Sequence, residues 1–142
     1  MMPKTLHFIC ERGKDHFAKP ILDQIDLNVI KKLGSNDLSH IINTFGASNI
    51  WVEWANHPAI MASKVKRPWQ SLIIRIHRYE MYRQKWMSKI NWEKVDYVIF
   101  VNSELETQFK KTINNSVKTI TIPNAIEIDK FKMVKLSNQN SI

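Results

Sequence analysis

The sequence predicts an α/β protein, in which a Rossmann-like, doubly wound sheet of six mostly parallel strands carries helices on both faces. Short apolar runs of strand length alternate along the chain with segments in which apolar residues recur at helical spacing. Such alternation favours right-handed strand–helix–strand crossovers and a parallel sheet. Residues 72–76 and 97–101 are almost continuously apolar, as strands covered on both sides are. The 142 residues suffice for one domain with a full hydrophobic core.

The first half of the chain contains three expected strands, over residues 6–10, 27–30 and 49–52. A helix is expected between the first two strands, where Phe17, Ile21, Leu22 and Ile25 recur at near-helical spacing. Pro20 lies inside that segment and removes a backbone hydrogen bond beyond the first turn. We therefore expect this helix to start late or to be kinked.

The clearest helix signal follows the second expected strand. Ser35, Asn36 and Asp37 are residues that cap helix N-termini, and Gly46 is a typical stop signal. Between the cap and the stop, one apolar face is expected to pack on the sheet, and it consists of Leu38, Ile41, Ile42 and Phe45.

The second half contributes the other three expected strands, over residues 72–76, 97–101 and 118–122. Pro58 suits the first turn of a helix whose basic C-terminal end precedes Pro68, where cations meet the negative end of the helix dipole. A longer helix is expected over residues 79–92. The last helix is expected to begin at Ser103 with a capping box that reaches Glu106.

Composition and charge exclude several classes of protein. Cys10 is the only cysteine, which excludes an internal disulfide framework and favours a reducing, cytoplasmic setting; we expect it to be a small buried side chain. No apolar run reaches the roughly 20 residues that cross a bilayer, and the N-terminus lacks the apolar stretch of a signal peptide. The net charge of +8 favours acidic partners, such as nucleic acid, anionic lipid or phosphate-bearing substrates, and is equally typical of a soluble basic surface.

Known sequence motifs exclude further activities. Gly13 is the only glycine of the first loop, so the Gly-x-Gly-x-x-Gly fingerprint of NAD and FAD sites is absent, as is the phosphate-binding Gly-x-x-x-x-Gly-Lys-Ser/Thr loop of NTPases. The Gly-x-Ser-x-Gly elbow of α/β-hydrolases does not occur. The five histidines and Cys10 show no spacing of metal ligands. We therefore expect neither a cofactor nor a metal ion.

Polar residues follow five of the six expected strands. In an open parallel sheet, ligands bind beyond the carboxyl ends of the strands, where helix N-termini also offer free N–H groups to anions. Helix caps need polar residues at the same positions, so any one of them, taken alone, is more simply explained as a cap. The substrate-binding candidates at this edge are Arg12, Gly13, Glu53, Asn56, Arg78, Glu80, Asn102, Ser103 and Asn124.

Residues 75–80 are the sharpest single feature of the sequence, because they place His77, Arg78 and Glu80 within four residues of one strand end. A histidine exchanges a proton near neutral pH, and an arginine binds a phosphate or a sugar carboxylate through its fork of donors. Glu80 would hydrogen-bond sugar hydroxyls or hold Arg78 in place. The structural alternative is that Arg78 and Glu80 are first-turn surface residues and that His77 only makes a hydrogen bond at the strand end.

Four segments occur in the order, and on the elements, in which they stand in one subgroup of the family 4 glycosyltransferases. They are Val-Glu-Trp-Ala-Asn at 52–56, Arg-Ile-His-Arg-Tyr-Glu at 75–80, Val-Asp-Tyr-Val-Ile-Phe-Val at 95–101 and Ile-Pro-Asn-Ala-Ile at 122–126. Over residues 50–128 the chain therefore resembles the N-terminal domain of these two-domain GT-B enzymes, whereas the first 48 residues match only in outline. The resemblance implies one half of a GT-B fold over residues 1–130, with residues 131–142 as a loose tail or the start of an interdomain linker.

The resemblance also implies a function in carbohydrate biosynthesis, such as that of cell envelope polysaccharides. The chain would be the acceptor-binding half of a glycosyltransferase in the cytoplasm, with a glycan or lipid-linked acceptor. His77 would take the catalytic place beside the donor phosphate or the transferred sugar, with Arg78 and Glu80 as neighbours, and the loop from Glu53 to Asn56 would line the acceptor side. Retention of the anomeric configuration is typical of the family.

In this family a C-terminal domain holds the nucleotide-sugar donor, and we expect that domain to be missing here. Because transfer needs donor and acceptor in one dry cleft, the isolated half should catalyse little or nothing. Two positions depart from the family pattern. Gly13 alone remains of the glycine-rich loop that usually follows the first strand, and Ala125 stands where the Pro-Asn-Gly motif has glycine.

The segment over residues 79–92 mixes aromatic rings with cations, as interfacial membrane helices do. Its apolar positions also suit packing on the sheet, which we favour over a peripheral contact with the inner face of a membrane. The alternative function, from a different class, is a non-catalytic Rossmann-like module that binds nucleic acid or another polyanion. Since the sequence contains neither a basic stripe nor an RNA-binding signature, nucleic acid is not expected as a partner.

Overall fold

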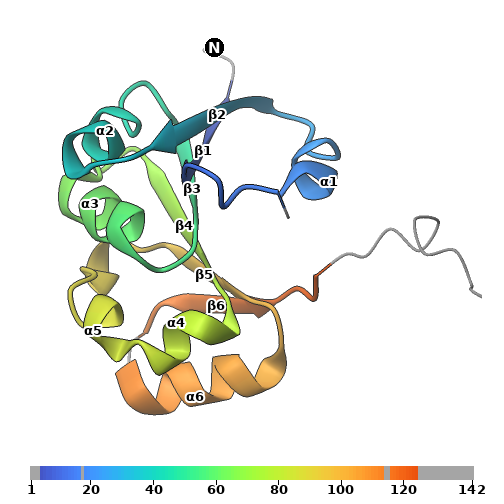
Figure 1. The fold of residues 1–142 in the computed structure, drawn as a ribbon, viewed down its shortest axis with the longest axis vertical. Helices are drawn as coiled ribbons and strands as arrows, with labels where there is room; N and C mark the ends of the chain where they lie inside the picture. The colour runs from blue at the N-terminus through green and yellow to red at the C-terminus, as the bar shows by residue number, and fades with distance from the viewer. Residues whose placement is uncertain (1–3, 17, 114–115, 125–142) are drawn as a thin grey trace, which may run out of the picture.

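The computed structural model describes residues 4–16, 18–113 and 116–124. Its centre is a six-stranded sheet in the order β2-β1-β3-β4-β5-β6, in which every neighbouring pair is parallel (Figure 1). The strands are β1 (Thr5–Glu11), β2 (Asn28–Gly34), β3 (Asn49–Glu53), β4 (Ser71–Ile76), β5 (Tyr97–Phe100) and β6 (Lys118–Thr121). The predicted α/β, Rossmann-like fold is therefore confirmed.

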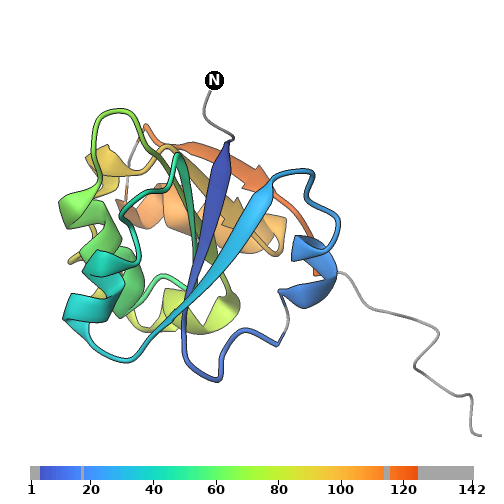
Figure 2. The same cartoon turned by 90° about the horizontal axis from the view of Figure 1, so that it is seen from above.

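The helices divide unequally between the two faces of the sheet (Figures 1 and 2). The chain winds from β1 to β2 in one direction and then from β3 to β6 in the other, so right-handed crossovers place only the first helix on one face. That helix is α1 (Lys19–Leu22), a single turn. The opposite face carries α2 (Asp37–Ile42), α3 (His57–Val65), α4 (Arg78–Tyr82), α5 (Gln84–Met87), the 3₁₀ helix η1 (Trp92–Lys94) and α6 (Ser103–Ile113).

Side chains alternate between these faces along each strand and form two cores. The larger core lies under the second group of helices and includes Ile50, Val52, Ile74, Phe100 and Phe109. The smaller core lies under α1 and includes Leu6, Phe8, Cys10, Ala18 and Trp51. Burial raises the pKa of the Cys10 thiol to about 12, which keeps it in the neutral form. The expectation of a small buried side chain at this position is confirmed.

The predicted packing face of α2 is wrong for three of its four residues, and only Ile41 is partly buried. Asn36 caps this helix, and Gly46 follows it with φ +81°, as expected. However, Leu38, Ile42 and Phe45 are 65%, 53% and 46% exposed, whereas His40 is buried. The reason is the approach of α2 to β2, because a Cβ atom at Gly34 would lie only 2.4 Å from Nδ1 of His40. The histidine fills the space beside this glycine and turns the apolar ridge outward.

The single helix predicted over residues 79–92 is also wrong. Arg83 leaves the helical conformation at φ −107° and ψ 61°, which separates α4 from α5. The buried side chains of the segment explain the break, since Met81, Met87, Ile90 and Trp92 do not fall on one face of a continuous helix. Two short helices and η1 allow all four to reach the core.

Candidate functional site

A cavity of about 510 Å³ lies over the carboxyl ends of β1, β3 and β4. The winding direction reverses between β1 and β3, and ligands of open α/β sheets bind at such switch points. The lining comes from the loops after these three strands and from the helices that follow them: Glu11, Lys14, His16, Trp54, Asn56, His57, Tyr79, Glu80, Arg83 and Trp86.

Aromatic rings form much of the wall of this cavity. The ring centres of Trp86 and His57 lie 4.3 Å apart, and the guanidinium carbon of Arg83 lies 4.8 Å from the ring centre of Tyr79. Polar side chains interleave with these rings, and some of them pair with one another: Asn56 Nδ2 donates to Glu11 Oε1 over 3.1 Å, and Lys14 forms an ion pair with Glu11. Aromatic rings together with placed polar groups are typical of small-molecule sites.

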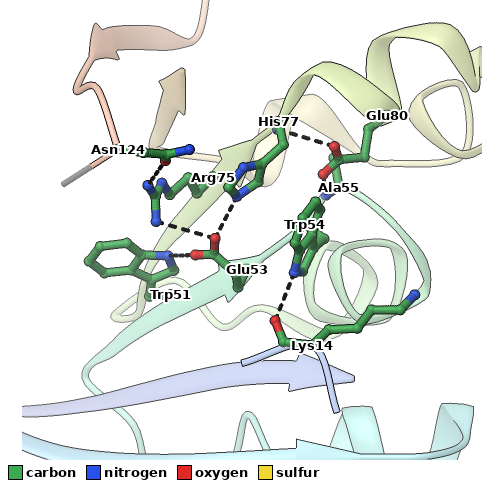
Figure 3. Close-up of polar contacts among 9 residues, drawn as sticks. All are labelled: Lys14, Trp51, Glu53, Trp54, Ala55, Arg75, His77, Glu80 and Asn124. Atoms are coloured by element: carbon green, nitrogen blue, oxygen red, sulfur yellow. Dashed lines mark hydrogen bonds and ion pairs between the residues drawn. The ribbon is translucent and has the colours of Figure 1, made fainter. Parts of the chain in front are cut away.

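Beside the cavity, three charged or titratable side chains form a buried cluster (Figure 3). Glu53 ends β3, while Arg75 and His77 belong to β4 and the residue after it; they are 1%, 2% and 8% exposed. Glu53 Oε1 lies 2.6 Å from His77 Nε2 and accepts from Arg75 Nη1 over 3.3 Å. Glu53 Oε2 accepts from Trp51 Nε1 over 3.1 Å. From the end of β6, Asn124 Oδ1 accepts from Arg75 Nη2 over 2.5 Å.

Trp54 stands between the cluster and the cavity. Its indole lines the cavity and stacks on the His77 ring, with ring centres 4.0 Å apart and planes at 25°. Its Nε1 donates to the carbonyl of Lys14 over 3.1 Å. The backbone of Trp54 has φ +76°, a strained value for a residue other than glycine, and such strain gathers at functional sites.

Glu80 is buried near the same place but has different partners. Its two oxygens accept from the backbone N–H groups of Ala55, over 3.0 Å, and His77, over 3.1 Å. Burial raises the pKa of this carboxyl. Glu80 therefore ties the turn after β3 to the end of β4. Arg78 does not share this environment; it is exposed, and its Nε donates to the Tyr82 hydroxyl over 3.2 Å.

The other predicted site residues lie around this centre. Asn56 lines the cavity. Arg12 and Gly13 are exposed in the loop after β1, where Arg12 N donates to the carbonyl of Gly34 over 3.2 Å and Gly13 has φ +84°. Asn102 and Ser103 are exposed at the end of β5 and do not line the cavity.

The predicted capping box at the start of α6 is wrong. Asn102, not Ser103, is the cap, because its Oδ1 accepts from the backbone N–H of Leu105 over 2.9 Å. Glu106 instead turns toward β6, where its two oxygens accept from Thr119 and Thr121. This carboxylate therefore joins the last helix to the edge strand.

Trp51 and Arg75 were not among the site residues predicted from the sequence, and Trp54 was included only as part of the loop from Glu53 to Asn56. One signal was available for Arg75, since it is the only charged residue in an otherwise apolar strand, and a buried cation needs a partner. The partner is Glu53, which faces Arg75 in the register of β3 and β4. For Trp54, no pattern in the sequence indicates the unusual backbone conformation.

No model of a known protein family and no curated protein matches this chain. Within the described residues, no three His, Cys, Asp or Glu side chains gather closely enough to hold a metal ion. Among the helices of the same residues, none has the length and apolar character needed to cross a membrane.

Proposed function

We propose that this chain is the acceptor-binding half of a GT-B glycosyltransferase, which moves a sugar from a nucleotide-sugar to a glycan or lipid-linked acceptor. One observation carries the proposal. Glu53, Arg75, His77 and Asn124 converge from the ends of β3, β4 and β6 beside an aromatic cavity at the switch point of the sheet (Figure 3). These residues belong to three of the four segments that resemble the family 4 enzymes.

The cavity suits the acceptor. A volume of about 510 Å³ falls within the range of small-molecule sites, and the rings of Trp54, Tyr79 and Trp86 offer faces on which the C–H groups of a sugar can stack. Asn56 and Glu11 supply donors and acceptors for hydroxyl groups. His77, on the other side of the Trp54 ring, would then face the donor, whose nucleotide would be held by a second domain.

Joining a donor domain to the chain tests this function. We expect transfer from a nucleotide-sugar in the joined protein and little or none from the chain alone. His77→Ala in the joined protein should lower turnover by about a hundredfold or more, the size of a typical acid–base or hydrogen-bonding contribution. His7→Ala is the matched control. His7 is also buried, but it lies on β1, where its Nδ1 hydrogen-bonds the carbonyl of Asn43. Unchanged turnover in His77→Ala would remove His77 from the mechanism.

A lipid-linked acceptor would bring α4 and α5 to the inner face of a membrane. Tyr79 and Tyr82 are exposed there, and Lys85 and Lys89 lie near the Trp86 ring. Rings and cations on one surface are typical of interfacial contacts. We expect the chain to sediment with phosphatidylglycerol vesicles and not with phosphatidylcholine vesicles, and the double variant Lys85→Gln, Lys89→Gln to lose this binding. Equal binding to both kinds of vesicle would contradict an electrostatic contact.

The alternative function, a non-catalytic module for nucleic acid or another polyanion, rests on the same surface. Cations close to exposed rings also bind stacked bases of single strands. A salt titration of binding to a single-stranded oligonucleotide separates the two functions. Tight binding that falls steeply with ionic strength and ignores sequence would favour the polyanion module, whereas weak binding at physiological salt is expected for the transferase half.

A further inference from the structure

The charged side chains that line the cavity do not all compensate one another. We propose that the saccharide bound in this cavity is acidic: its carboxylate or phosphate group pairs with the guanidinium of Arg83, while its ring stacks on the aromatic wall. Arg83 is then the residue that makes the site prefer an anionic sugar to a neutral one. This inference rests on the proposed function, because it names the class of acceptor that the same cavity would bind.

The two carboxylates of the lining already have partners. Glu11 accepts from Asn56 Nδ2 over 3.1 Å and forms an ion pair with Lys14. Glu80 is 2% exposed, and each of its two oxygens accepts a hydrogen bond from a backbone N–H group. Both negative groups of the lining are therefore engaged, and so is its lysine.

Arg83 is the cation of the lining that has no carboxylate partner among the described residues. It lies at the break between α4 and α5 and is exposed. Its guanidinium carbon is 4.8 Å from the ring centre of Tyr79, which lines the same cavity. Contact with a ring face uses none of the five N–H donors of a guanidinium. These donors form a planar fork that matches two oxygens of a carboxylate or a phosphate.

The side chains around Trp86 add positive charge to this part of the cavity. Lys85 Nζ and Lys89 Nζ lie 5.8 and 5.7 Å from the centre of its ring, and neither lysine forms an ion pair within the described residues. On another side of the ring, His57 has Asp37 as its own acidic partner, 3.4 Å from Nδ1. Cations without partners beside a cavity give a positive potential that attracts anionic ligands.

The aromatic wall indicates that the anionic group belongs to a larger, ring-shaped ligand. A free carboxylate or phosphate ion would fill only a small part of a cavity of about 510 Å³. The faces of Trp54, Tyr79 and Trp86 would remain uncovered by such an ion, whereas the C–H groups of a sugar can stack on them. Uronic acids and sugar phosphates contain both parts, a ring and one anionic group.

Titration of the whole ¹⁵N-labelled chain with methyl glucoside, methyl glucuronide and glucose 6-phosphate tests the proposal without a donor domain. The indole N–H signal of Trp86, assigned by its loss in Trp86→Phe, reports binding in the cavity. We expect one of the two acidic sugars to bind about tenfold more tightly than methyl glucoside, as one charge-assisted hydrogen bond at an exposed site provides. The tighter of the two identifies the anionic group as a carboxylate or a phosphate.

The outcomes of this titration separate the acid preference from the function. Equal dissociation constants for all three sugars overturn the preference and leave the acceptor function standing. Inorganic phosphate at the same concentration should not shift the indole signal, and a shift as large as that with the acidic sugar overturns the proposal of a saccharide. No shift with any sugar overturns it as well. The proposed function itself is tested by sugar transfer in the joined protein, so the two can fail separately.

Substitution of Arg83 tests its role in the preference. Because Arg83 is exposed, Arg83→Gln should fold, and it should bind the acidic sugar no more tightly than methyl glucoside. Arg83→Lys should keep part of the difference, since it keeps the charge and loses the fork. The matched control is Arg67→Gln, because the guanidinium of Arg67 also lies 4.8 Å from an exposed ring, that of Phe45, and does not line the cavity. A preference that survives in Arg83→Gln, or that Arg67→Gln lowers equally, overturns the assignment to Arg83.

Discussion

Glu53, the last residue of β3, and Glu80, in the first turn of α4, are at most 2% exposed and both contact His77, but they are held in different ways. Glu53 meets side chains: the Trp51 indole, the Arg75 guanidinium and the His77 ring. The hydrogen bonds of Glu80 come from two backbone N–H groups, and burial raises the pKa of its carboxyl. The cost of burying Glu53 is offset by the positive charge of Arg75, and the cost of burying Glu80 is offset by hydrogen bonds from the backbone.

The difference separates chemistry from architecture within one site. A carboxylate held by side chains can set the charge and the tautomer of a neighbour. A carboxylate held by the backbone fixes the relative position of two loops, here those after β3 and β4. Changes at Glu53 should therefore alter the electrostatics of the cluster, and changes at Glu80 should loosen the wall of the cavity.

The largest expected effect is that of Glu53→Ala. Its removal leaves the Arg75 cation buried without its carboxylate, and breaking a buried ion pair in this way typically costs about 3–5 kcal/mol of unfolding free energy. Urea unfolding followed by circular dichroism measures the loss. Adding Arg75→Met to the variant should recover part of it, because no uncompensated charge then remains. A loss of less than about 1 kcal/mol would mean that water or Asn124 compensates Arg75 instead.

A smaller effect is expected for Glu80→Gln. The amide keeps one acceptor oxygen for two buried backbone N–H groups, so one of them loses its partner, at a cost of about 1–3 kcal/mol. The same unfolding experiment measures it. Glu104→Gln, on the exposed first turn of α6, is the control and should change little. If Glu80→Gln costs as much as Glu53→Ala, the two carboxylates are not held differently after all.

Much of the fold follows from the sequence because parallel strands need apolar residues on both sides. All six strands lie where apolar runs predict them, with β2 extending four residues further, to Gly34. The position of most candidate residues at the carboxyl edge follows from the same rule. The packing of α2 does not, since it depends on the contact between His40 and Gly34, two residues whose patterns carry no hydrophobic signal.

The site was predictable only in part, for a similar reason. His77, Glu53 and Asn124 were expected at one edge, and the structure joins them through Arg75. That link depends on the register in which Glu53 faces Arg75, and a sequence pattern gives the position of a strand but not its register. Asn102 shows the opposite case, because a polar residue at a strand end serves there as a helix cap.

The dependence of stability on pH sharpens the comparison with a third carboxylate. Hydrogen bonds from Lys110, Thr121 and Thr119 lower the pKa of Glu106 from 4.5 to about 2, whereas burial raises that of Glu80. The stability that Glu106 contributes is therefore present above pH 4.5 and is lost as the pH falls toward 2. The contribution linked to Glu80 has the opposite sign: it is fully present below pH 4.5 and is lost as the pH rises through the raised pKa.

Urea unfolding between pH 7 and pH 2 resolves the two contributions if wild type is compared with Glu106→Gln and with Glu80→Gln. The advantage of wild type over Glu106→Gln should shrink on acidification, because the variant carries no proton to gain. The advantage over Glu80→Gln should grow over the same range, because protonation removes the cost of burying the charge. The pH-dependent change at Glu106 should be smaller than the losses expected for Glu53→Ala and Glu80→Gln at neutral pH, because Glu106 is partly exposed. Two differences of the same sign would show that the backbone N–H groups, and not burial, control Glu80.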